Sequence, residues 1–252
     1  MDRAFFALLS SVARAAIAAE LATGLRADNK DCAGYDPVTE ADRAAERALR
    51  AAIEAAFPEH GICGEEYGDV RSGAAVRWSL DPVDGTRALV CGLPSWAVLV
   101  GLIRDGEHAA GMIDLPALDE TLLGLDGVTT RNGEPVRTSG CASLAEARLS
   151  TTDPYLFTDP APFERVRRVA RVTRYGLDAL AYARVATGEL DLVIESGLKP
   201  HDYDALVAVV RGAGGAIGNW AGGSDLSGGD VVAAASRALY QQAVALLGGR
   251  AG

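Results

Sequence analysis

Apolar residues recur every three or four positions through the first 22 residues, a spacing that predicts an amphipathic helix packed on a core. The apolar positions are Phe5, Phe6, Leu9, Val12, Ala13, Ala16, Ile17 and Leu21. A polar segment containing Gly24, Gly34 and Pro37 follows and predicts a loop. A second helix is then predicted over about residues 40–57.

The hydrophobic pattern changes to short runs between residues 76 and 123. These runs are apolar or β-branched and are separated by glycine, proline and acidic residues, which predicts consecutive and largely antiparallel strands. Beyond them, Asn132 and Gly133 form a strong hairpin-turn signal. The N-terminal half, about residues 1–140, is therefore expected to combine helices with an antiparallel sheet in an α+β arrangement.

Helices and strands alternate in the C-terminal half, about residues 141–252. Helical spacing covers 162–172, and a further helix ends at Gly188. A short buried strand follows, and the next helix is closed by glycines. The chain shows no internal repeat and no low-complexity linker. Both halves are therefore expected to form one layered α/β (α+β) body, a single domain over residues 1–252.

Composition and charge narrow the classes of function. The chain is 49% hydrophobic and carries 34 acidic against 24 basic residues, a net charge of −10. A nucleic-acid partner is not expected, because phosphate backbones would be repelled. No stretch is expected to be long and apolar enough to span a membrane. The apolar N-terminal stretch is interrupted by charges at Asp2, Arg3, Arg14 and Glu20.

Four cysteines stand far apart in the sequence without any CxxC pair. This spacing predicts neither a zinc ribbon nor a disulfide framework, and it favours a reducing cytoplasmic location. They are Cys32, Cys63, Cys91 and Cys141.

Four segments carry acidic residues in settings that composition does not explain. In chain order they are "DPVTEAD" at 36–42, "GEEYG" at 64–68, "DPVDGT" at 81–86 and "KPHDYD" at 199–204. In the third, Asp81 closes a strand whose apolar run would bury it, and a buried carboxylate is costly unless paired or bound to metal. Pro82 stiffens the following turn. Asp81, the carbonyl of Val83 and Asp84 can then face one point and offer a hard divalent cation the oxygen ligands it prefers.

Thr86 stands where a helix can begin, directly after Gly85, which permits a close backbone approach. A helix N-terminus directs backbone N–H groups outward and binds phosphate. Carboxylates for magnesium beside an anion site are what a phosphoryl-transfer enzyme needs. Metal ions neutralise the phosphate oxygens and lower the pKa of an attacking water.

Structural roles can explain each segment taken alone. The third segment can be an Asx-turn leading into a capped helix, and Thr39 with Asp42 has the form of a capping box. Glu65 and Glu66 can be a solvated pair, and the acids of the fourth segment can be first-turn residues of a helix. Purely structural explanations are less convincing for the four segments taken together, because four such segments in this order are improbable as coincidence. Capping and catalysis by Thr39 and Asp42 can coexist.

The combination of "GEE", "DPVDGT" and a late aspartate followed by "GAGG" resembles the inositol monophosphatase superfamily of magnesium-dependent phosphomonoesterases. The resemblance runs through nearly the whole chain. The segments "GEEYG", "DGTRALVCGLPSW", "RYGLDALAY" and "LKPHDYDALV" are most similar to the histidinol-phosphate phosphatase branch. The resemblance implies a layered αβαβα sandwich with the site at its centre, a small phosphate ester as substrate, and a homodimer as the common assembly.

The resemblance also assigns magnesium ligands. Glu65, Asp81 and the carbonyl of Val83 would hold the activating ion, whereas Asp81, Asp84 and Asp202 would hold a second one. Glu65 is also available to a third ion and counts among the catalytic residues, so two or three magnesium ions per site are implied.

The same resemblance places the water and the phosphate. Asp42 with Thr39, and Thr86 hydrogen-bonded to Asp42, would orient and deprotonate the water. Gly85 and Thr86 would bind the phosphate through backbone N–H groups. In-line attack of the water on phosphorus requires no phosphoenzyme. Cys91 is accordingly interpreted as a small buried residue.

Three positions depart from the branch. Lys30 lies nine residues before Thr39, two more than expected, so the loop that presents a third-metal residue has an altered length. Asp204 adds an acid where a small residue is usual. His201 occupies a usually aromatic position and is interpreted as a packing substitute rather than a ligand.

Substrate choice depends on residues beyond the shared metal site. The resemblance places Asp178 and Glu195 near the leaving group, where two acids favour a cationic substrate such as histidinol phosphate over inositol phosphate. Alternatively, Asp178 caps the helix that follows it. Arg174 is expected to position the phosphate or, with slight preference, to pair with Asp178. Trp96 is expected to be a core aromatic residue.

The chain is therefore predicted to be a magnesium-dependent phosphatase of histidinol phosphate. Two alternatives stay open: a phosphatase of inositol-1-phosphate or related sugar or polyol phosphates, and a catalytically silent relative that binds metal or ligand for regulation. One set of residues is intact and counts against the silent relative, namely Glu65, Asp81, Asp84, Thr86 and Asp202.

Overall fold

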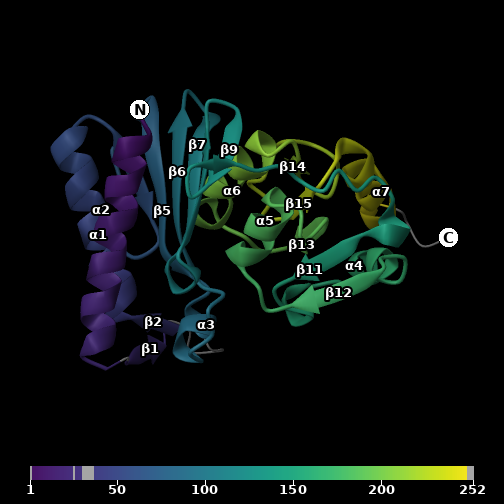
Figure 1. The fold of residues 1–252 in the computed structure, drawn as a ribbon, viewed down its shortest axis with the longest axis horizontal. Helices are drawn as coiled ribbons and strands as arrows, with labels where there is room; N and C mark the ends of the chain where they lie inside the picture. Colours follow the sequence, from purple (N-terminus) through teal and green to yellow (C-terminus); the bar gives the residue numbers. More distant parts are fainter. Residues whose placement is uncertain (1, 25, 30–36, 249–252) are drawn as a thin grey trace.

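The computed structural model describes residues 2–24, 26–29 and 37–248, which form two sheets of unequal size with helices between and around them (Figure 1). The helices of this described part are α1 (Arg3–Ala22), α2 (Glu40–Ala56), α3 (Thr86–Val90), α4 (Ala161–Arg167), α5 (Ala179–Ala186), α6 (Pro200–Gly212) and α7 (Arg237–Gly248). Short 3-10 turns lie at Pro116–Leu118, Leu144–Glu146 and Pro154–Leu156.

The larger sheet has the strand order β10-β9-β8-β7-β6-β5-β3-β4. Its strands are β3 (Gly61–Gly64), β4 (Gly68–Val70), β5 (Val76–Asp84), β6 (Ala97–Arg104), β7 (Glu107–Leu115), β8 (Glu120–Leu125), β9 (Val128–Arg131) and β10 (Glu134–Pro135). Neighbours are antiparallel except for the parallel pair β3 and β5. The predicted antiparallel strands and the hairpin turn at Asn132 and Gly133 are thus confirmed.

The smaller sheet has the order β12-β11-β13-β15-β14 and mixes parallel with antiparallel pairs. Its strands are β11 (Arg148–Thr151), β12 (Val172–Tyr175), β13 (Leu192–Glu195), β14 (Ala216–Gly218) and β15 (Val231–Ala234). Helices α1 and α2 cover the outer face of the large sheet, α5 and α6 fill the space between the sheets, and α4 and α7 cover the outer face of the small sheet (Figure 1). The predicted αβαβα layering is confirmed.

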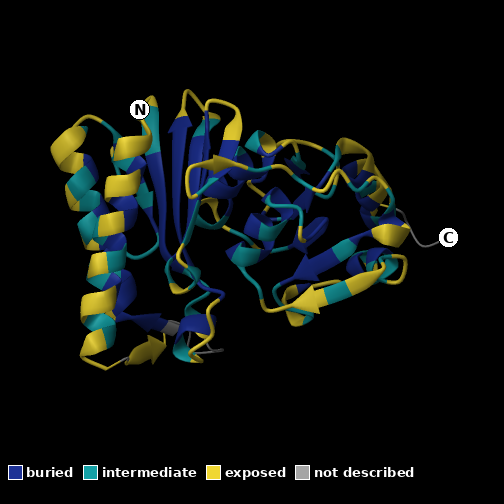
Figure 2. Ribbon diagram, in the orientation of Figure 1, coloured by how far each residue is buried: buried dark blue, intermediate teal, exposed yellow. Residues whose placement is uncertain are grey.

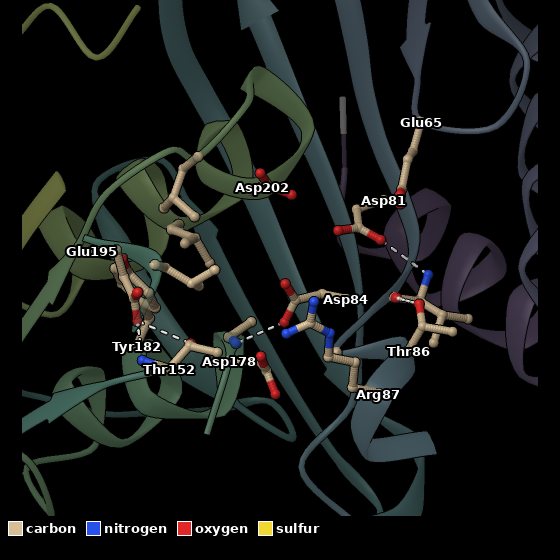
Figure 3. Close-up of a pocket in the computed structure, with 16 residues that line it drawn as sticks. Glu65, Asp81, Asp84, Thr86, Arg87, Thr152, Asp178, Tyr182, Glu195 and Asp202 are labelled. Carbon is tan, nitrogen blue, oxygen red and sulfur yellow. Dashed lines mark hydrogen bonds between the residues drawn. The ribbon is translucent and has the colours of Figure 1, made fainter. Parts of the chain in front are cut away.

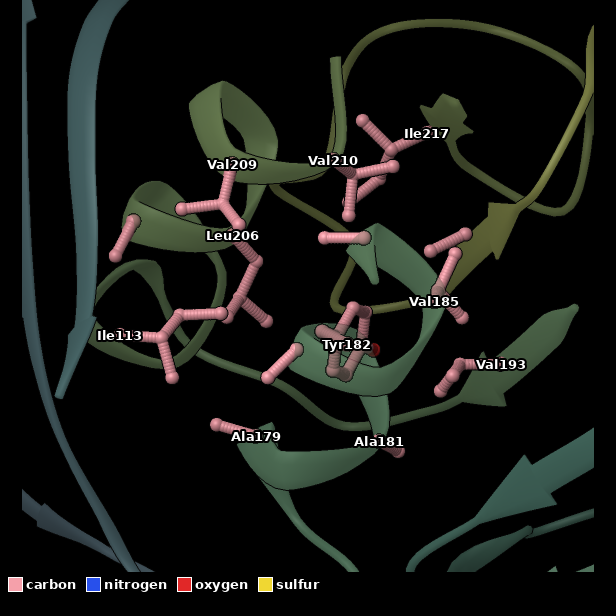
Figure 4. Close-up of a cluster of buried hydrophobic side chains, with 14 of the residues drawn as sticks. Ile113, Ala179, Ala181, Tyr182, Val185, Val193, Leu206, Val209, Val210 and Ile217 are labelled. Carbon is pink, nitrogen blue, oxygen red and sulfur yellow. The ribbon is translucent and has the colours of Figure 1, made fainter. Parts of the chain in front are cut away.

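The middle layer is a continuous apolar cluster (Figure 4). Leu206 and Val210 of α6 and Val185 of α5 meet Ile113 of the large sheet and Val193 of the small one. The central strands of both sheets are mostly buried, whereas the edge strand β12 and one side of the outer helices are exposed (Figure 2). Burial of this apolar area, at roughly 25 cal/mol per Å², is the main term that holds the two sheets together.

Glycines in the large sheet let α6 approach it at backbone distance. A Cβ added to Gly111 would lie 2.0 Å from the carbonyl oxygen of Ala205, and one added to Gly124 would lie 2.5 Å from that of Ala208. No side chain fits in either place. Helix α6, which carries Asp202 in its first turn, is therefore fixed closely against the sheet that carries Asp81 and Asp84.

Several element boundaries differ from the sequence-based expectation. Strand β5 continues through Asp81 to Asp84 instead of ending at Asp81. Helical spacing after Pro162 holds only to the end of α4, and Val172 begins an edge strand. The segment expected to be a loop contains a small antiparallel pair, β1 (Ala27–Asn29) and β2 (Pro37–Thr39). Strands this short carry little sequence pattern, so their pairing depends on the surrounding fold.

The expectation that no stretch is long and apolar enough to span a membrane is wrong for α1. This helix has 20 residues, and an 18-residue stretch within it has a mean hydropathy of 1.6, which meets both criteria. One side of it, including Phe6, Leu9 and Ile17, is nevertheless buried against α2 and the large sheet, as in a helix of a protein core (Figure 2).

Candidate active site

Acidic side chains from separate elements converge on one pocket of about 260 Å³ between the two sheets (Figure 3). Its acidic lining residues are Glu65, Asp81, Asp84, Asp178, Glu195 and Asp202. Among the described residues that line it, Arg87 is the single basic one. Elements from both halves of the chain therefore build the site, and the pocket attracts cations.

Three of these carboxylates form a compact cluster. One oxygen each of Asp81, Asp84 and Asp202 lies within 4.8 Å of the others. Burial, and then the negative charge of neighbouring carboxylates, raises the pKa of Asp81 and of Asp84 well above the ordinary value, and burial also raises that of Asp202. Carboxylates held this close repel one another unless a cation lies between them. An all-oxygen donor set of this charge fits magnesium.

A β-bulge at the end of β5 directs these side chains. Asp81 pairs with Leu99 of β6 and Asp84 with Ala97, so three steps along β5 face two along β6. Pro82 lies inside the bulge, where its missing N–H is not needed by the ladder. The N–H of Val83 donates to Asp81 Oδ1 at 3.1 Å. The stiff turn predicted at Pro82 is therefore a bulge within a strand.

The N-terminus of α5 is directed at Asp84. The Ala179 N–H donates to Asp84 Oδ2 at 2.7 Å, and this hydrogen bond opposes the rise in the Asp84 pKa. Asp178 stands at the N-cap position of α5, but its side chain accepts no capping hydrogen bond there. The alternative that the Asp178 side chain caps this helix is wrong.

Thr39, Asp42 and Thr86 form a hydrogen-bonded chain. The capping box is present: the Thr39 N–H donates to Asp42 Oδ2 at 2.9 Å, and the Thr39 hydroxyl forms a short hydrogen bond with the same oxygen. The other oxygen, Asp42 Oδ1, lies 3.0 Å from Thr86 Oγ1. Burial raises the pKa of Asp42. Asp42 therefore both caps α2 and bonds the threonine that was predicted to orient the water.

Helix α3 begins at Thr86 as predicted, with Gly85 in the left-handed region at φ 80°. This backbone conformation favours glycine, and a Cβ on Gly85 would also lie in tight contact with Asp178, 3.0 Å from its Oδ2. Phosphate binding by the Gly85 and Thr86 N–H groups stays a prediction. Cys91, one residue after α3, is exposed, and its interpretation as a buried residue is wrong.

On the opposite side of the pocket, Glu195 is buried at the end of β13. Glu195 Oε1 accepts hydrogen bonds from the Thr152 N–H at 2.7 Å and from the Thr152 hydroxyl at 3.0 Å, and Oε2 accepts one from Thr151. Burial nevertheless raises the pKa of Glu195 to about 8. Burial raises the pKa of Asp178 to about 6, partly offset by the positive charge of Arg87.

The sequence singled out four further residues, three of which lie in the described part of the chain. Arg174 is exposed on β12 and does not line the pocket, so its predicted contact with substrate has no support in the structure. Asp204 lies 2.9 Å from His108 Nε2, packed against the large sheet. His201 is mostly buried, with Nε2 3.6 Å from Asp202 Oδ1. Lys30 lies outside the described residues.

Sequence reasoning missed several residues of the pocket. Arg87 follows Thr86 directly, and Thr152 is the first residue after β11. Tyr182 of α5 lines the pocket but has the spacing of an ordinary core residue of an amphipathic helix. Of these three residues, only Arg87 could have been identified from the sequence, because it is a charged residue directly after the acidic motif "DPVDGT".

Tyr182 leads to a prediction about stability. In the described part of the chain, two buried side-chain polar atoms have no hydrogen-bond partner, the hydroxyl oxygens of Ser79 and Tyr182. Replacing Tyr182 by phenylalanine removes such an atom and is expected to raise the free energy of unfolding by about 1 kcal/mol, measured by urea denaturation. Tyr240→Phe is the matched control. Its hydroxyl donates to the Asn219 carbonyl at 3.1 Å, so that variant should be less stable by a similar amount. A destabilised Tyr182→Phe protein would contradict the prediction.

A layered αβαβα body with a buried carboxylate cluster at the meeting point of its sheets defines a class of metal-dependent phosphatases. The sequence model of the inositol monophosphatase family matches residues 2–249, and the chain belongs to that family. The structure of an inositol monophosphatase from Zymomonas mobilis superposes with a TM-score of 0.83 at 38% identity, covering 95% of this chain and 94% of that one.

Two relatives show how the chain lies within the family. It is 42% identical over 222 residues to the bifunctional phosphatase IMPL2 of Arabidopsis thaliana, covering 82% of this chain but only 64% of that protein's length. It is 32% identical over 216 residues to the histidinol-phosphatase of Chlorobaculum parvum, covering 84% and 83% of the two chains. The chain is thus a phosphatase of the inositol monophosphatase family.

Proposed function

We propose that the protein hydrolyses histidinol phosphate to histidinol and inorganic phosphate, with magnesium as its cofactor. The observation that carries this proposal is the pair of acidic side chains, Asp178 and Glu195, that lines the pocket beside the carboxylate cluster. The amine and imidazole of histidinol would find opposite charge there, whereas a polyol needs neutral partners. The similarity to proteins named histidinol-phosphatase, from Chlorobaculum parvum and Mycobacterium tuberculosis, supports the same substrate.

Asp81, Asp84 and Asp202 are the side chains that would hold magnesium, with Glu65 and the carbonyl of Val83 as further ligands. When bound there, magnesium neutralises the phosphate oxygens and lowers the pKa of the attacking water. The protein supplies the ligand geometry through the β5 bulge and the fixed position of α6. Two or three ions per site remain part of the proposal.

Thr86 and Asp42 would orient the water. The Thr86 hydroxyl has one proton, and donating it to Asp42 leaves the oxygen free to accept a hydrogen bond from a water. The raised pKa of Asp42 makes this carboxylate a better proton acceptor than an exposed aspartate. The phosphate would lie over the start of α3, and the leaving group would extend toward Asp178 and Glu195.

Phosphate release from a panel of esters tests the proposal. The panel contains histidinol phosphate, myo-inositol-1-phosphate and a sugar phosphate, each assayed with magnesium and with a chelator. We expect the highest kcat/KM for histidinol phosphate and no turnover without metal. A higher kcat/KM for either neutral ester would reject the proposed substrate, and no turnover of any ester would support the catalytically silent alternative.

A sugar or polyol phosphatase is the second candidate. The fructose-1,6-bisphosphatase/inositol-1-monophosphatase of Thermotoga maritima is 35% identical over 200 residues, so the shared site is compatible with neutral leaving groups. The same panel decides between the two substrates. We also propose a cytoplasmic homodimer, on the cysteine spacing and the family resemblance, and light scattering would measure its mass.

A further inference from the structure

Glu46, in the middle of α2, is a wholly buried carboxylate outside the pocket. Its oxygens accept the backbone N–H of Glu66 at 2.7 Å and that of Tyr67 at 3.2 Å. Arg50, one turn later on the same helix, donates to Glu46 through Nε at 2.7 Å. A buried carboxylate is tolerated only with such partners. Glu46 therefore ties α2 to the turn between β3 and β4.

The rest of that turn also fits closely against α2. Arg50 forms a short hydrogen bond with the Gly68 carbonyl. A Cβ on Gly64 would lie 2.1 Å from Glu46 Oε1, so no side chain fits between the turn and the carboxylate. On its other side the turn is held by the Glu65 N–H, which donates to the Leu80 carbonyl at 3.2 Å. The backbone around Glu65 is thus fixed between α2 and β5.

Helix α2 connects this turn with the residues that orient the water. Asp42 and Glu46 are four residues apart and lie on one face of the helix. Asp42 bonds Thr86, and Glu46 bonds the two residues after Glu65. One rigid helix therefore sets the distance between the water-orienting pair and Glu65, which lines the pocket beside Asp81.

We propose that Glu46 is a positioning residue that fixes Glu65 at the carboxylate cluster and thereby sets the metal affinity of the site. The inference rests on the proposed magnesium site but not on the identity of the ester. Glu46 makes no contact that would place it in the reaction. It acts through the backbone of residues 65–67, as partners behind a ligand commonly do.

Glu46→Gln tests this. The new NH₂ group must replace either Oε1, which accepts from Arg50 and the Tyr67 N–H, or Oε2, which accepts from the Glu66 N–H. At least one hydrogen bond to the turn is therefore lost at nearly constant shape. We expect Mn²⁺ affinity, titrated by electron paramagnetic resonance, to fall about tenfold. Amide exchange at Glu66 and Tyr67 should become faster, whereas kcat at saturating metal should change less than the metal affinity.

Asp114→Asn is the matched control. Asp114 is also fully buried and also held by an arginine, Arg14, with Nη2 2.8 Å from Oδ1, but it does not line the pocket. This variant should lose stability without losing Mn²⁺ affinity. The inference is overturned if Glu46→Gln keeps wild-type Mn²⁺ affinity, if both variants lose it equally, or if the wild-type protein binds no Mn²⁺. Failure of the ester assay alone would reject the proposed substrate and leave this result standing.

Discussion

Replacing Asp84 by asparagine is expected to lower kcat/KM about a thousandfold, a loss of about 4 kcal/mol in transition-state stabilisation. The same variant should be more stable than the wild-type protein when metal is removed. The asparagine side chain has nearly the same shape and would still accept the Ala179 N–H, which lies 2.7 Å from Asp84 Oδ2. What the substitution removes is a charge that magnesium binding needs and that the metal-free fold does not tolerate. Activity with magnesium and thermal unfolding in a chelator measure the two effects.

The gain in stability has a defined dependence on pH. Burial and the charge of Asp178 raise the pKa of Asp84 in the folded state above its value of 3.8 in the unfolded chain. The carboxyl group therefore lowers stability increasingly as pH rises above 3.8, toward the folded pKa. The advantage of the asparagine variant should be present at pH 7 and vanish below about pH 4.

Magnesium should reverse the order of stability of the wild-type and Asp84→Asn proteins. A ligand that binds only the folded state stabilises it, so saturating magnesium should raise the unfolding temperature of the wild-type protein more than that of the variant. Wild-type turnover in the Asp84→Asn protein would contradict the assignment of Asp84 as a metal ligand. Equal stability of the two proteins in chelator at pH 7 would contradict the repulsion argument.

Much of the site was predictable because its residues lie in short motifs with local chemical meaning. The capping box of Thr39 and Asp42 spans four consecutive residues, so it is recognisable from the sequence, and the structure contains it. Asp81, Asp84 and Asp202 were expected to converge from two distant segments, and they do. The prediction of this convergence depended on the family resemblance, because the local sequence of α6 does not determine which strand the helix packs against.

The remaining features depend on tertiary contacts that a local pattern does not contain. Glu46 and Arg50 have the spacing of an ordinary i, i+4 ion pair on a helix surface, yet Glu46 is fully buried against a turn twenty residues away. Asp178 has the residue type and position of an N-cap, but its φ of 48° directs the side chain elsewhere. Arg174 was expected to position the phosphate or, with slight preference, to pair with Asp178, but it is exposed on an edge strand and does not line the pocket.

Removing the two acids on the leaving-group side should change the choice of substrate far more than it changes turnover of a neutral ester. In the double variant Asp178→Asn with Glu195→Gln, we expect kcat/KM for histidinol phosphate to fall about a hundredfold, because a buried ion pair with the substrate is lost. The value for myo-inositol-1-phosphate should stay within a few fold. The glutamine that replaces Glu195 would still have an oxygen to accept the Thr152 N–H, which lies 2.7 Å from Glu195 Oε1, so the local structure should persist.

The pH dependence of the preference for histidinol phosphate tests whether Glu195 is the residue responsible for it. The pKa of Glu195 is raised to about 8, so in the metal-free protein this carboxyl group is mostly neutral at pH 7 and gains its charge as pH rises. Magnesium at the neighbouring cluster favours the ionised form and moves this transition to a lower pH. The ratio of kcat/KM for the cationic ester to that for the neutral ester should therefore increase with pH in the wild-type protein, and with magnesium bound this increase should be complete below pH 8. In Glu195→Gln that increase should be absent. The phosphate, imidazole and amine of the substrates titrate in the same way in both assays, so only the Glu195 carboxylate distinguishes the two proteins. A ratio that rises equally in both proteins would assign the selectivity to another group and remove the main physical support for histidinol phosphate as the substrate.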